Sequence, residues 1–103
     1  MWAQLMTMRL KPGKEGDLAK VYAQLRATEQ PGSGLVRTIA LKDDKDPSRV
    51  YTFVMFESEE KARARELDES RQEALQPVRA LMAEIFDGPP EFVDLTVVED
   101  TSY

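Results

Sequence analysis

The sequence predicts an α+β domain in which four strands and two helical regions follow the order βαββαβ. Four short segments have the pattern of strands, and residues 50–56 are the richest of them in β-branched and aromatic side chains. Two longer segments carry apolar residues at helical spacing, and turn residues separate the elements. The economical arrangement of these elements is a ferredoxin-like fold, a four-stranded antiparallel sheet with both helical regions on one face. At 103 residues, the chain is expected to form a single domain over residues 1–103.

The N-terminal half of this pattern begins with a strand predicted over residues 2–10, which Lys11-Pro12-Gly13 ends. A helix is expected over residues 14–28. Its apolar residues recur at positions i, i+3, i+4 and i+7, namely Leu18, Val21, Tyr22 and Leu25. The segment Gln30-Pro31-Gly32-Ser33-Gly34 then turns the chain into a second strand, predicted over residues 35–41.

The third strand, predicted over residues 50–56, differs from an ordinary amphipathic strand because both of its faces are apolar. Alternation places Val50, Thr52, Val54 and Phe56 on one face and Tyr51, Phe53 and Met55 on the other. Each large side chain left in water would forgo roughly 1.5–3 kcal/mol of burial free energy. Because one small chain has few elements with which to cover both faces, we predict a homodimer that packs through its sheet faces.

The second helical region is expected to begin at an N-cap formed by Ser58, with Glu59 and Glu60 in the first turn. A break is predicted near residues 68–70, where Ser70-Arg71-Gln72-Glu73 fits a capping box that would start a second piece. Pro77 predicts a kink or restart within that piece. An apolar stripe follows at Leu75, Val78, Leu81, Met82, Ile85 and Phe86, and a fourth strand is predicted over residues 92–98.

Composition narrows the possible chemistry. The chain has no cysteine and no histidine, which excludes thiolate nucleophiles and catalysis by Ser–His or Cys–His pairs. No cluster of carboxylates suggests a metal site. The net charge of −5 argues against binding to nucleic acid or anionic membranes. No apolar run approaches the ~18 residues of a membrane span, and the first residues lack a signal-peptide pattern, so a cytoplasmic location is expected.

Several turns resemble those of antibiotic-biosynthesis-monooxygenase domains: Lys11-Pro12-Gly13-Lys14-Glu15, Gln30-Pro31-Gly32-Ser33-Gly34 and Asp46-Pro47. The closest match is Phe53-Val54-Met55-Phe56-Glu57-Ser58-Glu59-Glu60-Lys61-Ala62, which resembles that family's aromatic-Glu-Ser-x-x-x-Ala turn from the third strand into the second helix. The resemblance covers about residues 2–98. It implies a dimeric α/β barrel with a pocket between sheet and helices in each subunit, and oxidation of quinols or polyketide aromatics without metal or flavin cofactors.

The chain departs from the haem-degrading members of that family. Those use an Asn on the first strand, a Trp and a His, at positions that align near Met6, Phe56 and Leu75. Without histidine the haem-degrading mechanism is excluded, and a cofactor-independent monooxygenase acting on a quinol-like or anthrone-like aromatic remains, with no assigned catalytic residue. The alternative is a non-catalytic dimeric module that binds a small ligand or serves as an accessory protein. The missing histidine and Phe56 in place of Trp favour this alternative.

Five residues are predicted to bind the substrate: Gln4, Met6, Met8, Tyr22 and Phe56. Met6, Met8 and Phe56 should face the helices, where they either line an apolar pocket or simply fill the core. The Tyr22 hydroxyl could donate to a phenolic oxygen or only satisfy itself within the protein. The Gln4 amide, on the same face, should find a backbone partner or bind ligand.

The other polar residues of the strands and loops are interpreted as structural. Thr52 is expected to be a satisfied strand threonine. Arg9 and Arg37 are expected to pair with acids such as Asp94 at the rim of the sheet interface, and the loop over residues 42–48 to be a solvated hairpin tip.

Overall fold

A computed structural model describes all 103 residues of the protein. The four strands are β1 (Trp2–Arg9), β2 (Leu35–Lys42), β3 (Arg49–Phe56) and β4 (Glu91–Thr96). They form one antiparallel sheet in the order β2-β3-β1-β4. The helices are a short 3₁₀ turn (Glu15–Asp17), α1 (Leu18–Thr28), α2 (Glu59–Glu66), α3 (Glu69–Ala74) and α4 (Gln76–Ile85). The predicted βαββαβ ferredoxin-like fold is confirmed.

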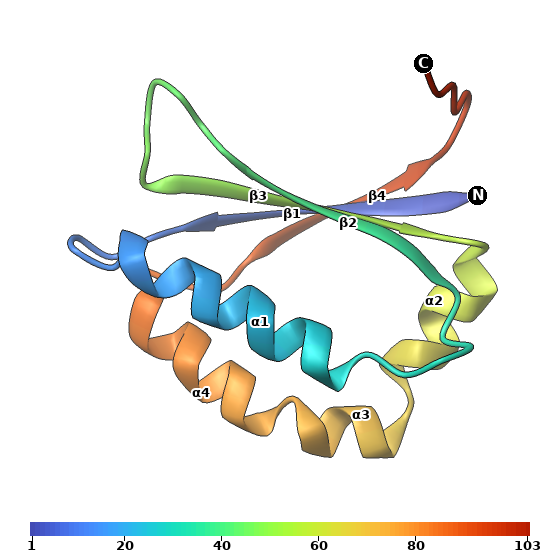
Figure 1. Ribbon diagram of the computed structural model, residues 1–103, viewed down its shortest axis with the longest axis horizontal. Coiled ribbons are helices and arrows are strands. Elements are labelled where there is room, and N and C mark those ends of the chain that lie inside the picture. The colour runs from blue at the N-terminus through green and yellow to red at the C-terminus, as the bar shows by residue number, and fades with distance from the viewer.

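The helices all lie on one side of the sheet, and no element of the chain covers the other side (Figure 1). Helices α1 and α4 run beside each other beneath the sheet, and α2 and α3 connect the end of β3 to α4. The protein therefore has two layers, and one face of the sheet is left without cover from its own chain. No helix has the length and apolar character needed to cross a membrane.

The core lies between the sheet and helices α1 and α4. Its main cluster contains Met8, Leu10, Val21, Val50, Leu75, Val78, Ile85 and Phe86. Met8 and Val50 face each other across β1 and β3, and Val50 is completely buried. A smaller cluster forms at the other end of these strands, where Trp2 and Phe56 are paired across β1 and β3 and pack with Ala62 of α2.

The second helical region follows the predicted pattern of breaks, with one correction. Ser58 caps α2, and its hydroxyl accepts a hydrogen bond from the Lys61 backbone at 3.2 Å. The cap of α3 is Asp68 and not Ser70, because the Asp68 carboxylate accepts from the backbone of both Ser70 and Arg71. Pro77 stands in the first turn of α4, where its missing N–H costs no helical hydrogen bond.

Two predicted strands are too long. β1 ends at Arg9, and Leu10 makes only an isolated bridge to Phe86. β4 ends at Thr96, which pairs with Trp2 at the very start of its partner strand. Beyond that point only the Val97 N–H bonds back to the residue before β1, to the Met1 carbonyl oxygen at 3.2 Å, and Val98, although apolar, is almost fully exposed.

The two faces predicted for β3 are confirmed. Val50, Thr52 and Phe56 are buried beneath the helices, whereas Tyr51 and Phe53 on the opposite face are only partly buried. The uncovered face extends over all four strands. Its apolar residues are Leu5 on β1, Ile39 and Leu41 on β2, Tyr51, Phe53 and Met55 on β3, and Val93 and Leu95 on β4. We refer to these residues as the open sheet face.

Candidate functional site

A cavity of about 960 Å³ lies between the sheet and the helices. All four strands contribute side chains to its wall, as do α1, α2, α3 and α4. The five residues predicted as substrate-binding all line it, namely Gln4, Met6, Met8, Tyr22 and Phe56. The size is within the range of sites that hold small organic molecules.

The cavity stays open because several of the positions that face it carry small side chains. Ala40 on β2, Ala62 on α2 and Ala83 on α4 all line it. Larger neighbours such as Val54 and Met82 remain only half-buried, because the space beside them is not filled. The main core cluster fills one end of the space between the sheet and the helices. Most of the residues that line the cavity are apolar.

A pair of hydroxyl groups provides the polar contact inside this wall. The oxygens of Tyr22 on α1 and Thr52 on β3 lie 2.5 Å apart, and either hydroxyl can be the donor. Burial raises the pKa of Tyr22, although the hydrogen bond with Thr52 works in the opposite direction. Tyr22 is therefore a neutral phenol at physiological pH. The Thr52 hydroxyl has a hydrogen-bond partner within the protein, as predicted. That partner is Tyr22, the side chain that was expected to contact ligand.

Gln4 finds a side-chain partner and not the backbone partner considered from the sequence. Its amide nitrogen donates to Asp94 on the neighbouring strand β4 at 3.0 Å. Because a carboxylate only accepts hydrogen bonds, the amide must present its nitrogen to Asp94, which leaves the Gln4 carbonyl oxygen without a protein donor. Gln4 can thus offer a hydrogen-bond acceptor to a molecule in the cavity.

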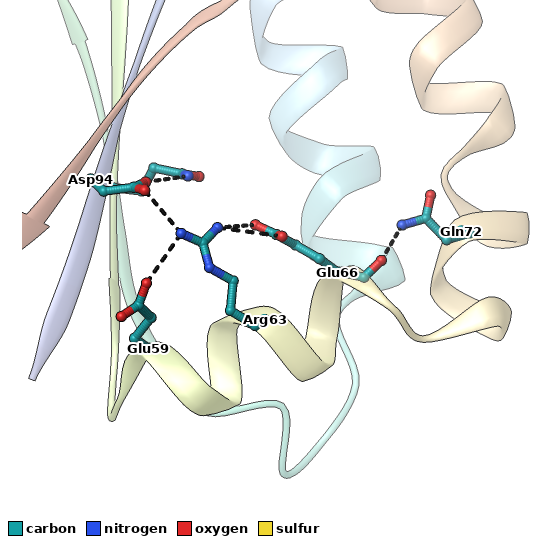
Figure 2. Close-up of polar contacts among 6 residues, drawn as sticks. Glu59, Arg63, Glu66, Gln72 and Asp94 are labelled. Atoms are coloured by element: carbon teal, nitrogen blue, oxygen red, sulfur yellow. Dashed lines mark hydrogen bonds and ion pairs between the residues drawn. The ribbon is translucent and has the colours of Figure 1, made fainter.

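Arg63 on α2 makes the ion pair that connects this helix to Asp94 on β4. Figure 2 shows its guanidinium between Asp94 and two glutamates of its own helix, with distances of 2.9 Å to Asp94, 3.2 Å to Glu59 and 3.3 Å to Glu66. Hydrogen bonds from Gln4 and Arg63, together with the charge of Arg63, lower the pKa of Asp94. Asp94 is therefore a fixed, charged group that positions Gln4.

The predicted pairing of Arg9 and Arg37 with Asp94 is wrong. Asp94 stands opposite Gln4 on the helix-covered side, whereas Arg9 and Arg37 alternate onto the other side of the sheet. Arg9 instead pairs with Asp46 of the hairpin loop at 3.1 Å and donates to Ser48 at 2.6 Å.

A second ion pair at the cavity was not predicted. Arg65 on α2 donates through two nitrogens to Glu29, which follows α1, with a shortest distance of 2.6 Å. Burial alone would raise the pKa of Glu29, but the bonds and charge of Arg65 outweigh it, and the pKa is lowered. No local pattern could reveal this pair, because its members are 36 residues apart in the sequence. The Arg65 guanidinium also lies 5.4 Å from the centre of the Phe56 ring.

The cavity contains no free carboxylate. Glu29 and Glu66 are its only acidic lining residues, and each is held by an arginine. No group of three or more acidic side chains is placed to hold a metal ion. The positions that align with the haem-degrading residues, Met6, Phe56 and Leu75, all line the cavity and are all apolar. The site can therefore desolvate and orient a flat apolar molecule and offer it hydroxyl and amide contacts.

Comparison with known proteins identifies the class of fold. No protein-family model matches the sequence, and no curated protein matches it. Solved structures do match, over nearly the whole chain. A proposed antibiotic biosynthesis monooxygenase from Bordetella bronchiseptica is 22% identical, with a TM-score of 0.75 over 95% of this chain and 97% of that chain.

Two further structures give the same picture. A proposed antibiotic biosynthesis monooxygenase from Caulobacter crescentus is 17% identical, with a TM-score of 0.74 over 95% of this chain and 90% of that chain. A protein of unknown function from Nitrosomonas europaea is 24% identical, with a TM-score of 0.73 over 99% of this chain and 93% of that chain. This chain therefore has the fold of the antibiotic biosynthesis monooxygenase structures, as its turn motifs predicted.

Proposed function

We propose that this protein is a cofactor-independent monooxygenase that acts on a small electron-rich aromatic molecule such as a quinol or an anthrone. The observation that carries the proposal is the apolar cavity of about 960 Å³ with the Tyr22–Thr52 hydroxyl pair and the Gln4 amide in its wall. A cavity filled by the protein's own side chains would have favoured a module without chemistry. The fold it shares with the solved structures is consistent with this activity but does not establish it.

The polar groups suit the oxygens of such a substrate. Thr52 stands opposite Met6 in the strand register, and Gln4 stands opposite Val54, so Gln4 and Thr52 are diagonal neighbours on adjacent strands. Diagonal neighbours lie about 7–8 Å apart. One aromatic ring can therefore rest on Met6 with an oxygen toward the hydroxyl pair and a phenolic O–H toward the Gln4 carbonyl.

The chemistry would use the substrate's own reactivity. The substrate loses a proton to give a carbanion or phenolate, which reacts with dioxygen to form a carbon–oxygen bond and a peroxide. The peroxide then loses water, so that one oxygen atom stays in the quinone product and the other leaves in water. Dioxygen is reduced and the aromatic is oxidised by four electrons. The protein contributes orientation, exclusion of water and hydrogen bonds to the developing oxyanion.

A non-catalytic module that binds a small ligand is the second candidate, and one observation favours it. Both carboxylates that line the cavity are held in ion pairs, and the raised pKa of Tyr22 keeps that hydroxyl protonated. No side chain in the wall is thus a free base for the first proton transfer. Such a site would bind the aromatic and leave its oxidation to another protein.

We further propose that two copies pack with their open sheet faces together. Leu41, Val93 and Leu95 on this face are between 37% and 49% exposed, and nothing in the chain covers them. A contiguous apolar face of this kind is typical of an interface. Burial by a second copy would leave the cavity on the far side of each sheet untouched.

Oxygen uptake by chelator-treated protein, with a panel of quinols and anthrones, tests the proposed activity. We expect uptake above the autoxidation rate that is lost on heat denaturation. Tyr22→Phe and Gln4→Leu should lower turnover while the assembly state stays unchanged. Tyr103→Phe is the matched control, because it removes the same hydroxyl from a fully exposed tail residue. Binding of these aromatics without uptake would support the non-catalytic module.

A further inference from the structure

Positively charged side chains outnumber negatively charged ones around the cavity. Four arginines line it, Arg26, Arg65, Arg71 and Arg79, against the two glutamates Glu29 and Glu66. This excess of positive charge occurs in a chain whose net charge is −5. The cavity therefore has a local electrostatic character opposite to that of the whole protein, which would favour an anionic ligand.

The two glutamates do not neutralise all four arginines. Glu29 is occupied by Arg65, and Glu66 pairs with Arg63, which stands outside this cavity. Arg79 donates only to the neutral amide oxygen of Gln72, at 2.5 Å. Arg71 makes no ion pair and no side-chain hydrogen bond. Three guanidinium groups at the cavity, those of Arg26, Arg71 and Arg79, are thus without a carboxylate partner.

Arg71 is partly buried, whereas Arg26 and Arg79 are exposed. Arg79 is near enough to Arg71 for its charge to act on the Arg71 guanidinium. Burial lowers the pKa of Arg71, and the nearby positive charges of Arg65 and Arg79 lower it further, which the charges of Glu29 and Glu66 offset only in part. A guanidinium remains charged under all physiological conditions, so these effects represent a free-energy cost in the unliganded protein. An anion bound beside Arg71 would offset that cost.

We propose that Arg71 and Arg79 bind a carboxylate group of the aromatic ligand that occupies the cavity. The ligand is then an aromatic carboxylate, with its ring against the apolar wall and its anionic group at the two arginines. A planar guanidinium can donate two parallel hydrogen bonds to a carboxylate, which fixes the ring's orientation. The inference deepens the proposed function by naming the substrate class, but it requires only that the cavity binds an aromatic molecule.

Calorimetric titration with 2-naphthoate and the neutral, nearly isosteric 2-naphthamide tests the inference at low salt and near pH 7.5. We expect the native protein to bind the carboxylate at least about tenfold more tightly, since a charge-assisted hydrogen bond is stronger than one to a neutral amide. Arg71→Gln should remove most of this preference and leave the affinity for 2-naphthamide nearly unchanged. Arg71→Lys should retain part of it. Lys45→Gln is the matched control, because it removes one positive charge from an exposed position in the hairpin loop.

The outcomes separate this inference from the proposed function. Equal binding of the two probes, or a preference that survives Arg71→Gln in folded protein, would overturn the carboxylate site and leave the oxygenase proposal standing. A preference lost equally in Lys45→Gln would reduce the effect to net charge and overturn the site as well. Binding of neither probe at millimolar concentration would contradict both the site and an aromatic-binding cavity. Carboxylate preference without oxygen uptake would sustain the site and contradict the catalytic proposal.

Discussion

The two faces of the sheet are built from alternate residues of the same strands, yet they have different environments. On the helix-covered face, Val50 is completely buried and Met8 is 5% exposed. On the open sheet face, Leu41 remains 48% exposed and Val93 49% exposed. A chain of this length has enough helix to cover one face, and even that cover leaves a cavity. The proposed ligand site and the proposed partner site are therefore separated by the thickness of one sheet.

The largest expected effect comes from placing a charge on the open sheet face. Phe53→Lys should weaken a dimer by at least about a thousandfold, because each copy would bury an unpaired charge in a symmetric interface. Light scattering across a concentration series measures the change. Leu67→Lys is the matched control, since Leu67 is 80% exposed and lies at the end of α2, away from the sheet. A native protein that is monomeric at high micromolar concentration would contradict the proposed dimer.

Between the sheet and the helices, truncating a tightly packed core residue should cost more stability than truncating a residue that lines the cavity. Ile85→Ala should destabilise the protein by about 2–5 kcal/mol, because Ile85 is 1% exposed within the main core cluster. Met6→Ala should cost less, about 1–2 kcal/mol, since it enlarges a space that is already open. Urea unfolding at a fixed protein concentration measures both. Equal losses would indicate that Met6 is packed as tightly as the core.

The Glu29–Arg65 pair connects the end of α1 to α2 beside the cavity. Arg65→Gln should cost about 1–2 kcal/mol at pH 7, between the values for exposed and buried pairs. The pKa of Glu29 is lowered in the folded state, so the stabilisation is fully present above its unfolded pKa of about 4.3 and is lost as the pH falls through the lower folded value. The stability difference between native protein and variant should therefore shrink below about pH 4.3. A difference that stays constant from pH 7 to pH 3 would show that the charge on Glu29 is not involved.

The smallest effects concern the caps of the helical layer. Ser58→Ala should destabilise the protein by about 1 kcal/mol, since its hydroxyl accepts from the Lys61 backbone at the start of α2. Ser70→Ala should cost less than half as much, because the backbone N–H groups at the start of α3 donate to the Asp68 carboxylate and not to the Ser70 hydroxyl. Thermal unfolding of the two variants compares them. A larger loss for Ser70→Ala would restore the capping box predicted from the sequence.

Local patterns in the sequence were sufficient to predict the elements and the fold. The alternation in β3 and the 3.6-residue spacing in α1 and α4 reflect which side chains face the core, so both are visible in the linear order. Errors arose where a choice depended on geometry between neighbours. Asp68 and Ser70 are both good caps, and only the backbone path of the turn decides which oxygen meets the free N–H groups.

The candidate site was predicted only in part. Gln4, Met6, Met8, Tyr22 and Phe56 could be assigned to the helix-facing side from periodicity, and they do line one cavity. Whether they would enclose open space or pack together was left undecided, because that depends on the volumes of small residues such as Ala40 and Ala83 on other elements. No role at the cavity was predicted for Arg65, Arg71 or Arg79, since their relation to it depends on how α2, α3 and α4 turn beneath the sheet.

The sequence by itself determined the order of elements, the helix-facing side chains and the need to cover a second apolar face, because these follow from periodicity and burial. Only the tertiary structure decided that a cavity opens between the layers, that Tyr22 bonds to Thr52 and Gln4 to Asp94, and that three arginines at the cavity lack a carboxylate partner. The reason is physical. Hydrophobic patterning is read along the chain, whereas unfilled volume and charge pairing depend on residues that meet only after the chain has folded.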